Sequence, residues 1–165
     1  MPDPVIEPAI SPPRARIDEP APEFEARTTR GLVRLSDYRG RWLLFFSHPA
    51  DFTPVCTSEF IALQRAMPRF DALGCALLGL SVDSLYAHIA WVKDIETRFG
   101  EHIAFPIVED ISMAISRAYG MIHPGSATTA TVRSVFFIDP EGILKFSNTK
   151  VRTNRARMKA TRMAS

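Results

Sequence analysis

Residues 42–60, WLLFFSHPADFTPVCTSEF, contain a run of large apolar residues, a loop with a proline, and then the start of a helical pattern. The apolar run at 42–47 is typical of a buried strand. Apolar side chains then recur at helical spacing from residue 55 to residue 73, with a kink expected at Pro68. Cys56 is therefore expected in the first turn of a helix that follows a buried strand and a short loop.

The next stretch repeats this order of strand and helix. Residues 75–83, CALLGLSVD, form a continuous apolar strand, Ser84 can cap the helix that follows, and Gly100 can end it. A strand followed by a helix, twice in succession, predicts parallel strands. The sequence therefore predicts an α/β fold, with a central mixed β-sheet flanked by helices.

Shorter patterns complete this predicted sheet. A strand is expected around residues 32–35 and another within AFPIVED, residues 104–110. ISMAISRAYG, residues 111–120, reads as a short helix, and RSVFFIDPEGILKFS, residues 133–147, as an antiparallel hairpin that turns at DPEG.

The composition indicates one globular domain between two unusual ends. The chain has 165 residues, of which 46% are hydrophobic and 23% charged. Seven of its 13 prolines lie in residues 1–22, which predicts an extended or disordered arm before a domain at 23–149. Residues 150–165 carry six basic and no acidic side chains, so the rest of the chain is net acidic. This basic tail is expected to be disordered; binding to nucleic acid or anionic lipid is the less favoured interpretation.

Several features predict a cytoplasmic protein that does not enter a membrane. No apolar run approaches the roughly 20 residues that cross a bilayer. The N-terminal sequence lacks the basic start and apolar stretch of a secretory signal. Two cysteines, Cys56 and Cys75, are too few for a disulfide framework and suit a reducing compartment.

The position of Cys56 allows two interpretations. In the first turn of a helix, the thiol would lie beside backbone N–H groups without helical partners, at the positive end of the helix dipole, which favours the reactive thiolate. Thr53 could direct its hydroxyl at the sulfur or at an oxygen bound there, and Pro49 could hold the loop rigid and shield the thiolate. Alternatively, Cys56 is a small buried hydrophobe and its neighbours are loop and capping residues.

The sequence resembles the peroxiredoxin family. HPADFTPVCTSEF matches the family's P-x-x-x-T-x-x-C motif, with Pro49, Thr53 and Cys56 at the three fixed places. PAPEFEARTTRGLVRLSDYRGRWLLFF resembles the family's opening hairpin, GLSVDS its central strand, and RSVFFIDPEGIL its late strand, so the resemblance covers about residues 20–146. SHPADFTPVCTSEF and YGMIHPG are most similar to the one-cysteine, peroxiredoxin-6-like subgroup. After EGILKFSN the chain departs from that subgroup, and its C-terminus looks atypical or truncated.

This resemblance implies a thioredoxin-like fold and a role for each site residue. Cys56 would be the nucleophile that attacks the O–O bond of hydrogen peroxide or an organic hydroperoxide and becomes a sulfenic acid. Arg133, in the matching late strand, would hold the thiolate charged, and Glu59 would orient that arginine. A surface ion pair is the alternative for Arg133, and a solvated carboxylate for Glu59.

The sequence gives weaker evidence for a functional role of the histidines than for Cys56 and Arg133. His48 matches a histidine that lies near the cysteine in the one-cysteine subgroup, where it could bind substrate or reductant, or shuttle a proton. A purely structural contact is the alternative for His48. Cys56, His48 and His123 lack the paired spacing of a zinc motif, so neither a metal nor a cofactor is expected.

Cys75 is not expected to resolve the sulfenic acid. A helix of about 17 residues between the two cysteines would span roughly 25 Å, whereas a disulfide needs Cα atoms within about 7 Å. An external thiol such as glutathione, a thioredoxin-like protein or a small thiol would then restore Cys56. A homodimer through an edge strand is possible. The alternative function is a catalytically impaired redox-sensing or chaperone-like protein on the same fold.

Overall fold

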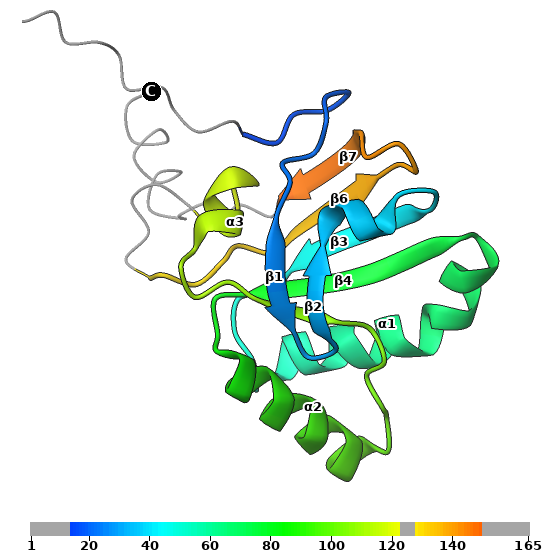
Figure 1. The fold of residues 1–165 in the computed structure, drawn as a ribbon. Helices are drawn as coiled ribbons and strands as arrows, with labels where there is room; N and C mark the ends of the chain where they lie inside the picture. Colours follow the sequence, from blue (N-terminus) through cyan, green and yellow to red (C-terminus); the bar gives the residue numbers. More distant parts are fainter. Residues whose placement is uncertain (1–13, 123–127, 150–165) are drawn as a thin grey trace, which may run out of the picture.

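Seven strands form one mixed sheet in the order β2-β1-β5-β4-β3-β6-β7 (Figure 1). A computed structural model describes residues 14–122 and 128–149. The described elements, in chain order, are β1 (Glu25–Thr28), β2 (Gly31–Arg34), a 3-10 helix (Leu35–Tyr38), β3 (Trp42–Ser47), α1 (Pro54–Ala72), β4 (Cys75–Ser81), α2 (Leu85–Phe99), β5 (Ile107–Glu109), α3 (Ala114–Ala118), β6 (Ser134–Ile138) and β7 (Leu144–Thr149).

The sheet is parallel at its centre and antiparallel toward both edges. β3 and β4 run parallel, β4 and β5 run parallel, and β6 pairs antiparallel with both β3 and β7. The predicted α/β class with a mixed sheet is therefore confirmed. The carboxyl ends of β3, β4 and β5 lie along one edge, which is where α/β proteins gather their functional loops.

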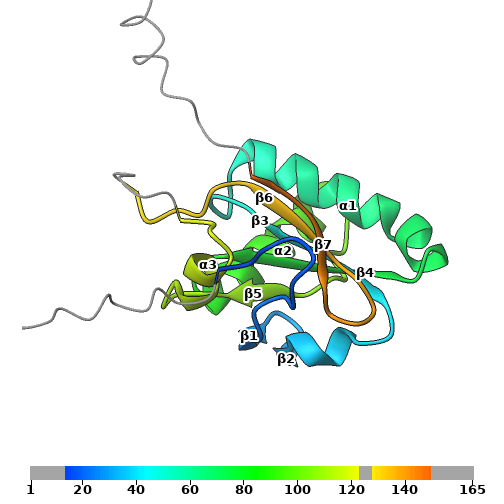
Figure 2. The same ribbon diagram turned by 90° about the horizontal axis from the view of Figure 1, so that it is seen from above.

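Alternate side chains of β3 build two separate cores. Leu43 and Phe45 pack into a cluster with residues of α3 and the chain that precedes β1, while Leu44 and Phe46 pack beneath α1 and α2. Figure 2 shows α1 on one side of the central strands, and the β1–β2 hairpin continues the sheet beyond β5. At Gly79 of β4, an added Cβ would lie 3.3 Å from the Phe60 ring. The absence of a side chain at this position lets α1 pack closely on β4.

Local signals at the helix ends act as the sequence predicted. The Ser84 side chain accepts a hydrogen bond from the N–H of Ala87 at the start of α2, and Gly100 ends that helix with φ at 69°. Pro68 lies inside α1, which nevertheless runs unbroken from Pro54 to Ala72. β5 is shorter than the predicted strand, because pairing with β4 involves only residues 107–109.

Part of the predicted N-terminal arm contacts the domain. The N–H of Ala15 donates to the Ala118 carbonyl, and the N–H of Ala21 donates to the Gly142 carbonyl. Ala21 is buried. Residues 1–13, the basic tail at 150–165 and the segment 123–127 that contains His123 lie outside the described residues. None of the described helices is long and apolar enough to cross a membrane.

Candidate active site

Cys56 lies in the first turn of α1, two residues after Pro54 begins the helix. The thiol is beneath the surface, since only 1% of the residue is exposed. N–H groups in a first helical turn have no partners within the helix, and the helix dipole adds partial positive charge there. Arg133 Nη2 lies 3.5 Å from Cys56 Sγ. Two sources of positive charge, the helix terminus and the Arg133 guanidinium, therefore converge on the sulfur.

Arg133 is fixed by contacts on both its backbone and its guanidinium group. The Ser47 hydroxyl donates to the Val132 carbonyl at 2.6 Å and accepts from the N–H of Ser134 at 3.1 Å, so the end of β3 holds the backbone on either side of the arginine. Arg133 Nη1 forms an ion pair with Glu59 Oε2. Because Glu59 lies one helical turn after Cys56, α1 carries both groups that the guanidinium contacts.

Thr53 and Pro49 occupy the loop between β3 and α1. Thr53 is the N-cap residue of α1. Its hydroxyl donates to the Ala50 carbonyl at 3.0 Å, and this bond holds the loop. Pro49 is half-buried next to His48. The structure thus gathers Cys56, Arg133 and Glu59 directly, and places Thr53 and Pro49 in the loop that leads to the cysteine.

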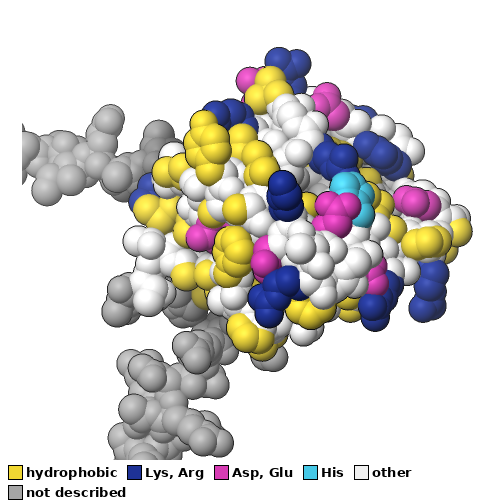
Figure 3. Space-filling view, turned by 90° about the horizontal axis from the view of Figure 1, so that it is seen from below, with side chains coloured by type: hydrophobic (Ala, Val, Ile, Leu, Met, Phe, Trp, Pro, Cys, Tyr) yellow, Lys and Arg dark blue, Asp and Glu magenta, His cyan; other side chains and the backbone are white. Residues whose placement is uncertain are grey.

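The surface beside Cys56 is shallow and partly apolar. A hollow of about 380 Å³ is lined by Pro54, Val55, Ser58, Glu59 and Ala62. Phe52 and Val55, which flank the start of α1, are both more than half exposed. Figure 3 shows the side of the molecule that includes α2, where hydrophobic side chains lie in small groups between charged ones. A small molecule can approach the first turn of α1 without crossing a deep cleft.

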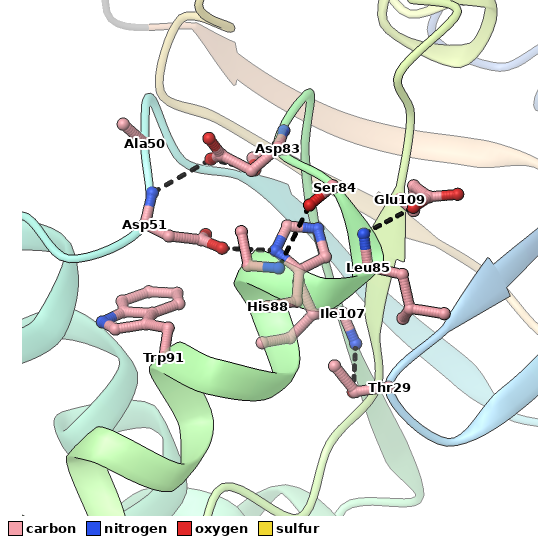
Figure 4. Close-up of polar contacts among 12 residues, drawn as sticks. Thr29, Ala50, Asp51, Asp83, Ser84, Leu85, His88, Trp91, Ile107 and Glu109 are labelled. Atoms are coloured by element: carbon pink, nitrogen blue, oxygen red, sulfur yellow. Dashed lines mark hydrogen bonds and ion pairs between the residues drawn. The ribbon is translucent and has the colours of Figure 1, made fainter.

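A buried chain of three polar residues lies behind the catalytic loop. His48 Nε2 lies 2.6 Å from Asp51 Oδ1, and His88 Nδ1 lies 2.6 Å from Asp51 Oδ2. His48 and His88 are 1% and 0% exposed. Figure 4 shows Asp51 directed from the loop toward His88 on α2. The three ligand atoms lie close enough for a metal ion. Their contacts are at hydrogen-bond length, so shared protons account for the arrangement.

The surroundings of His48 and Asp51 shift the pKa of both side chains. Burial lowers the pKa of His48, even though the hydrogen bond to Asp51 opposes that shift. Burial works against ionisation of Asp51, but hydrogen bonds from His48 and His88 outweigh it, and the pKa of this carboxyl is below its usual value. His48 is therefore neutral and Asp51 ionised at neutral pH.

Asp51 and His88 were not predicted as site residues. The sequence contains a signal for His88, because it shares a buried helix stripe with Trp91 and Ile95 at spacings of three and seven residues. A histidine on such an apolar stripe needs a polar partner, and Asp51 supplies it from 37 residues away in the chain.

Comparison with known proteins agrees with this geometry. Residues 17–147 match the model of the AhpC/TSA family. The chain is 53% identical over 131 residues to a protein named Peroxiredoxin of Aquifex aeolicus, covering 79% of this chain and 59% of that protein. It is 54% identical over 126 residues to Peroxiredoxin 2 of Thermoplasma acidophilum, covering 76% and 62%. The chain thus spans about 60% of the length of these relatives.

Solved structures with this fold include a 1-Cys peroxiredoxin and a peroxiredoxin 6. A yeast mitochondrial 1-Cys peroxiredoxin, described as resolved via glutathione/thioredoxin systems, has a TM-score of 0.75 and 35% identity, over 90% of this chain and 75% of that one. Peroxiredoxin 6 of Arenicola marina, as a cysteine-to-serine mutant, has a TM-score of 0.76 and 31% identity, over 87% and 70%. The thioredoxin-like fold expected from the sequence is confirmed. With the family match over residues 17–147 and these relatives, the chain belongs to the AhpC/TSA family of peroxiredoxins.

Proposed function

We propose that this chain is a thiol-dependent peroxidase in which the Cys56 thiolate reduces hydrogen peroxide and organic hydroperoxides. The contact between Arg133 Nη2 and Cys56 Sγ, at 3.5 Å, carries the proposal. A guanidinium at this distance favours the nucleophilic form of the sulfur and stabilises negative charge that develops on the peroxide oxygens. The relatives' names support this activity.

The reaction follows from these groups. The thiolate attacks one peroxide oxygen, an S–O bond forms as the O–O bond breaks, and the electron pair leaves on the second oxygen. That oxygen takes up a proton and departs as water or an alcohol. With the proton counted, thiolate, hydroperoxide and one proton give Cys56 sulfenic acid and the alcohol or water. Thr53 and Pro49 would shape the loop around the attacked peroxide, and Glu59 would orient Arg133.

Reduction of the sulfenic acid needs a thiol from outside the chain. Cys75 begins β4, beyond the far end of α1, and both cysteines are free and buried. Glutathione, a thioredoxin-like protein or a small thiol would attack the oxidised sulfur, release water and form a mixed disulfide that a second thiol reduces. A cytoplasmic location fits such reductants. Pairing of two copies through the edge strand β7 stays a prediction.

Stopped-flow mixing with hydrogen peroxide, together with a sulfenic-acid trap and mass spectrometry, tests this function. The reduced protein is expected to react at least a thousandfold faster than a free thiol, with the trapped product on Cys56. Cys56→Ser should abolish the reaction, and Cys75→Ser is the matched control that should retain it. A folded protein that reacts no faster than a free thiol would contradict the proposal.

The burial of Cys56 favours a second candidate function, that of a redox sensor. Because only 1% of this residue is exposed, a bulky reductant reaches the sulfur only if the start of α1 opens. If that opening is rare, the protein would act as a redox sensor, with oxidation but little turnover. Consumption of one equivalent of peroxide, without turnover under glutathione, thioredoxin or dithiothreitol, would favour the sensor over the peroxidase.

A further inference from the structure

His88 makes two hydrogen bonds that only its doubly protonated form can donate together. Nδ1 lies 2.6 Å from Asp51 Oδ2, and Nε2 lies 3.0 Å from the Val108 carbonyl oxygen. An ionised carboxylate and a carbonyl are both acceptors, so each needs an N–H from the ring. The ring is fully buried and lies against the carboxylate of Asp51.

Asp51 also determines which ring nitrogen of His48 carries the proton. Its second oxygen, Oδ1, accepts from His48 Nε2, which fixes the proton of the neutral His48 ring on Nε2. His48 Nδ1 is then left with a lone pair. In the part of the chain that the structure describes, this nitrogen is the one buried side-chain polar atom without a hydrogen-bond partner.

The unpartnered nitrogen belongs to a ring that packs against the helix carrying Cys56. The His48 ring lies 4.8 Å from the Phe60 ring and 5.0 Å from the Trp91 ring, measured between centroids. Phe60 and Cys56 are one turn apart on α1 and share one core cluster. A buried acceptor left unpaired is costly and rare in native proteins, so this nitrogen needs a functional explanation.

We propose that His88 is a positioning residue of this peroxidase, which acts through Asp51 to hold His48 as the neutral Nε2–H tautomer with an unprotonated Nδ1. The proposal rests on the peroxidase function. In the reaction, Nδ1 takes the proton of the attacked peroxide oxygen as the S–O bond forms. It then gives that proton to the departing oxygen, so that thiolate and hydroperoxide become sulfenate and alcohol. One proton from solvent then converts the sulfenate to the sulfenic acid.

The surrounding charges hold the loop where this relay requires it. The Asp51 N–H donates to Asp83 Oδ2 at 3.0 Å, and the Ser81 hydroxyl donates to the same oxygen at 2.7 Å. Glu109 accepts from the N–H of Leu85 at the start of α2. Figure 4 shows the Asp51–Asp83 and Leu85–Glu109 contacts near His88. Among the ionisable groups of these elements, Asp51 bonds His88 directly, and His48 and Glu109 interact with it electrostatically.

NMR of the imidazole rings in the wild-type protein tests the relay directly. Long-range ¹H–¹⁵N correlations at pH 7 should show His48 protonated on Nε2 alone and His88 protonated on both nitrogens, with signals assigned by their loss in His48 and His88 variants. Protonation of His48 on Nδ1, or a neutral His88, would overturn the proposal. This readout does not depend on catalysis, so it decides the relay even if the protein fails to react with peroxide.

Two matched substitutions separate the two bonds of His88. His88→Asn keeps an amide donor near the position of Nδ1 and loses the Val108 contact, whereas His88→Gln keeps a donor near Nε2 and loses the Asp51 contact. Each removes one bond from a buried site. Stopped-flow oxidation should be at least tenfold faster in His88→Asn than in His88→Gln. His102→Gln, at an exposed histidine, should match the wild type.

The rates and the spectra together decide the outcome. In His88→Gln, the His48 ring should lose its single tautomer, and His88→Asn should recover it. Equal rates for the two variants, with similar unfolding midpoints, would overturn the role of Asp51 as the intermediary. A slow wild-type protein with the expected tautomers would instead count against the proposed peroxidase and leave the relay intact.

Discussion

Cys56 and Cys75 lie at the two ends of α1 and are both buried, with 1% and 7% of each residue exposed, yet their surroundings differ in charge. Cys56 meets the positive end of the helix and the guanidinium of Arg133. Cys75 begins a central strand, where burial raises the pKa of its thiol. Burial is therefore common to the two cysteines, and the positive charge next to the sulfur is what distinguishes Cys56 from Cys75.

Removal of the arginine should erase most of this difference. Arg133→Gln takes away the cation beside Cys56 and should lower the rate of oxidation by hydrogen peroxide by about 10²–10³-fold, the usual cost of one preorganised charge-stabilising group. Stopped-flow kinetics measures the change. Arg65→Gln is the control, since it breaks an ion pair with Glu101 that starts from the same helix. A loss under threefold in Arg133→Gln would mean that the helix terminus alone activates the sulfur.

Alkylation should distinguish the two cysteines in the native protein. With iodoacetamide at pH 7, Cys56 should be modified at least tenfold faster than Cys75, because the loop before α1 opens more readily than a central strand and the thiolate is the reactive form. Peptide mass spectrometry after timed quenching gives both rates in one sample. In urea the two rates should converge. Equal rates without denaturant would remove the electrostatic contrast between the two ends of α1.

Periodicity in the sequence was sufficient to predict the elements that position Cys56. The apolar run of β3, the spacing along α1 and the caps of α2 are local patterns, and local patterns survive in the structure. Arg133 lies 77 residues from Cys56, and no local pattern pairs them. Its place beside the sulfur was predicted only by resemblance to a family, since tertiary contacts between distant segments leave no periodic trace.

Side-chain direction and buried polar contacts were harder to predict. The Thr53 hydroxyl was expected to face the sulfur or an oxygen bound there, which stays a prediction. Its bond to the Ala50 carbonyl was not predicted, although a short polar side chain next to a turn readily bonds the nearby backbone. The contact between Asp51 and His88 joins a loop to a helix and depends on the register of both. The apolar stripe that contains His88 indicated burial, though the partner could not be deduced from it.

The stability of the protein should also depend on pH through His48, which lies in the loop before α1. This is the smallest of the expected effects. Burial lowers the pKa of His48, so the unfolded chain binds a proton near pH 6.5 that the native protein does not bind. The free energy of unfolding should therefore fall as the pH drops below about 6.5, by at most about 1.4 kcal/mol per pH unit for this group. The pKa of Asp51 is also lowered, so its contribution is lost only at a more acidic pH, as the native carboxylate becomes protonated.

Urea unfolding at pH 7.5, 6.5 and 5.5 measures this slope. His48→Gln should flatten it, because no titratable ring is then left at that position. His102→Gln changes an exposed histidine and should keep the slope. Cys75 lies in apolar surroundings at the other end of α1, and Cys75→Ser should change the free energy of unfolding equally at all three pH values. A stability that rises toward pH 5.5 would mean that His48 gains its proton in the folded state, which would remove the neutral ring on which the charge arrangement behind Cys56 depends.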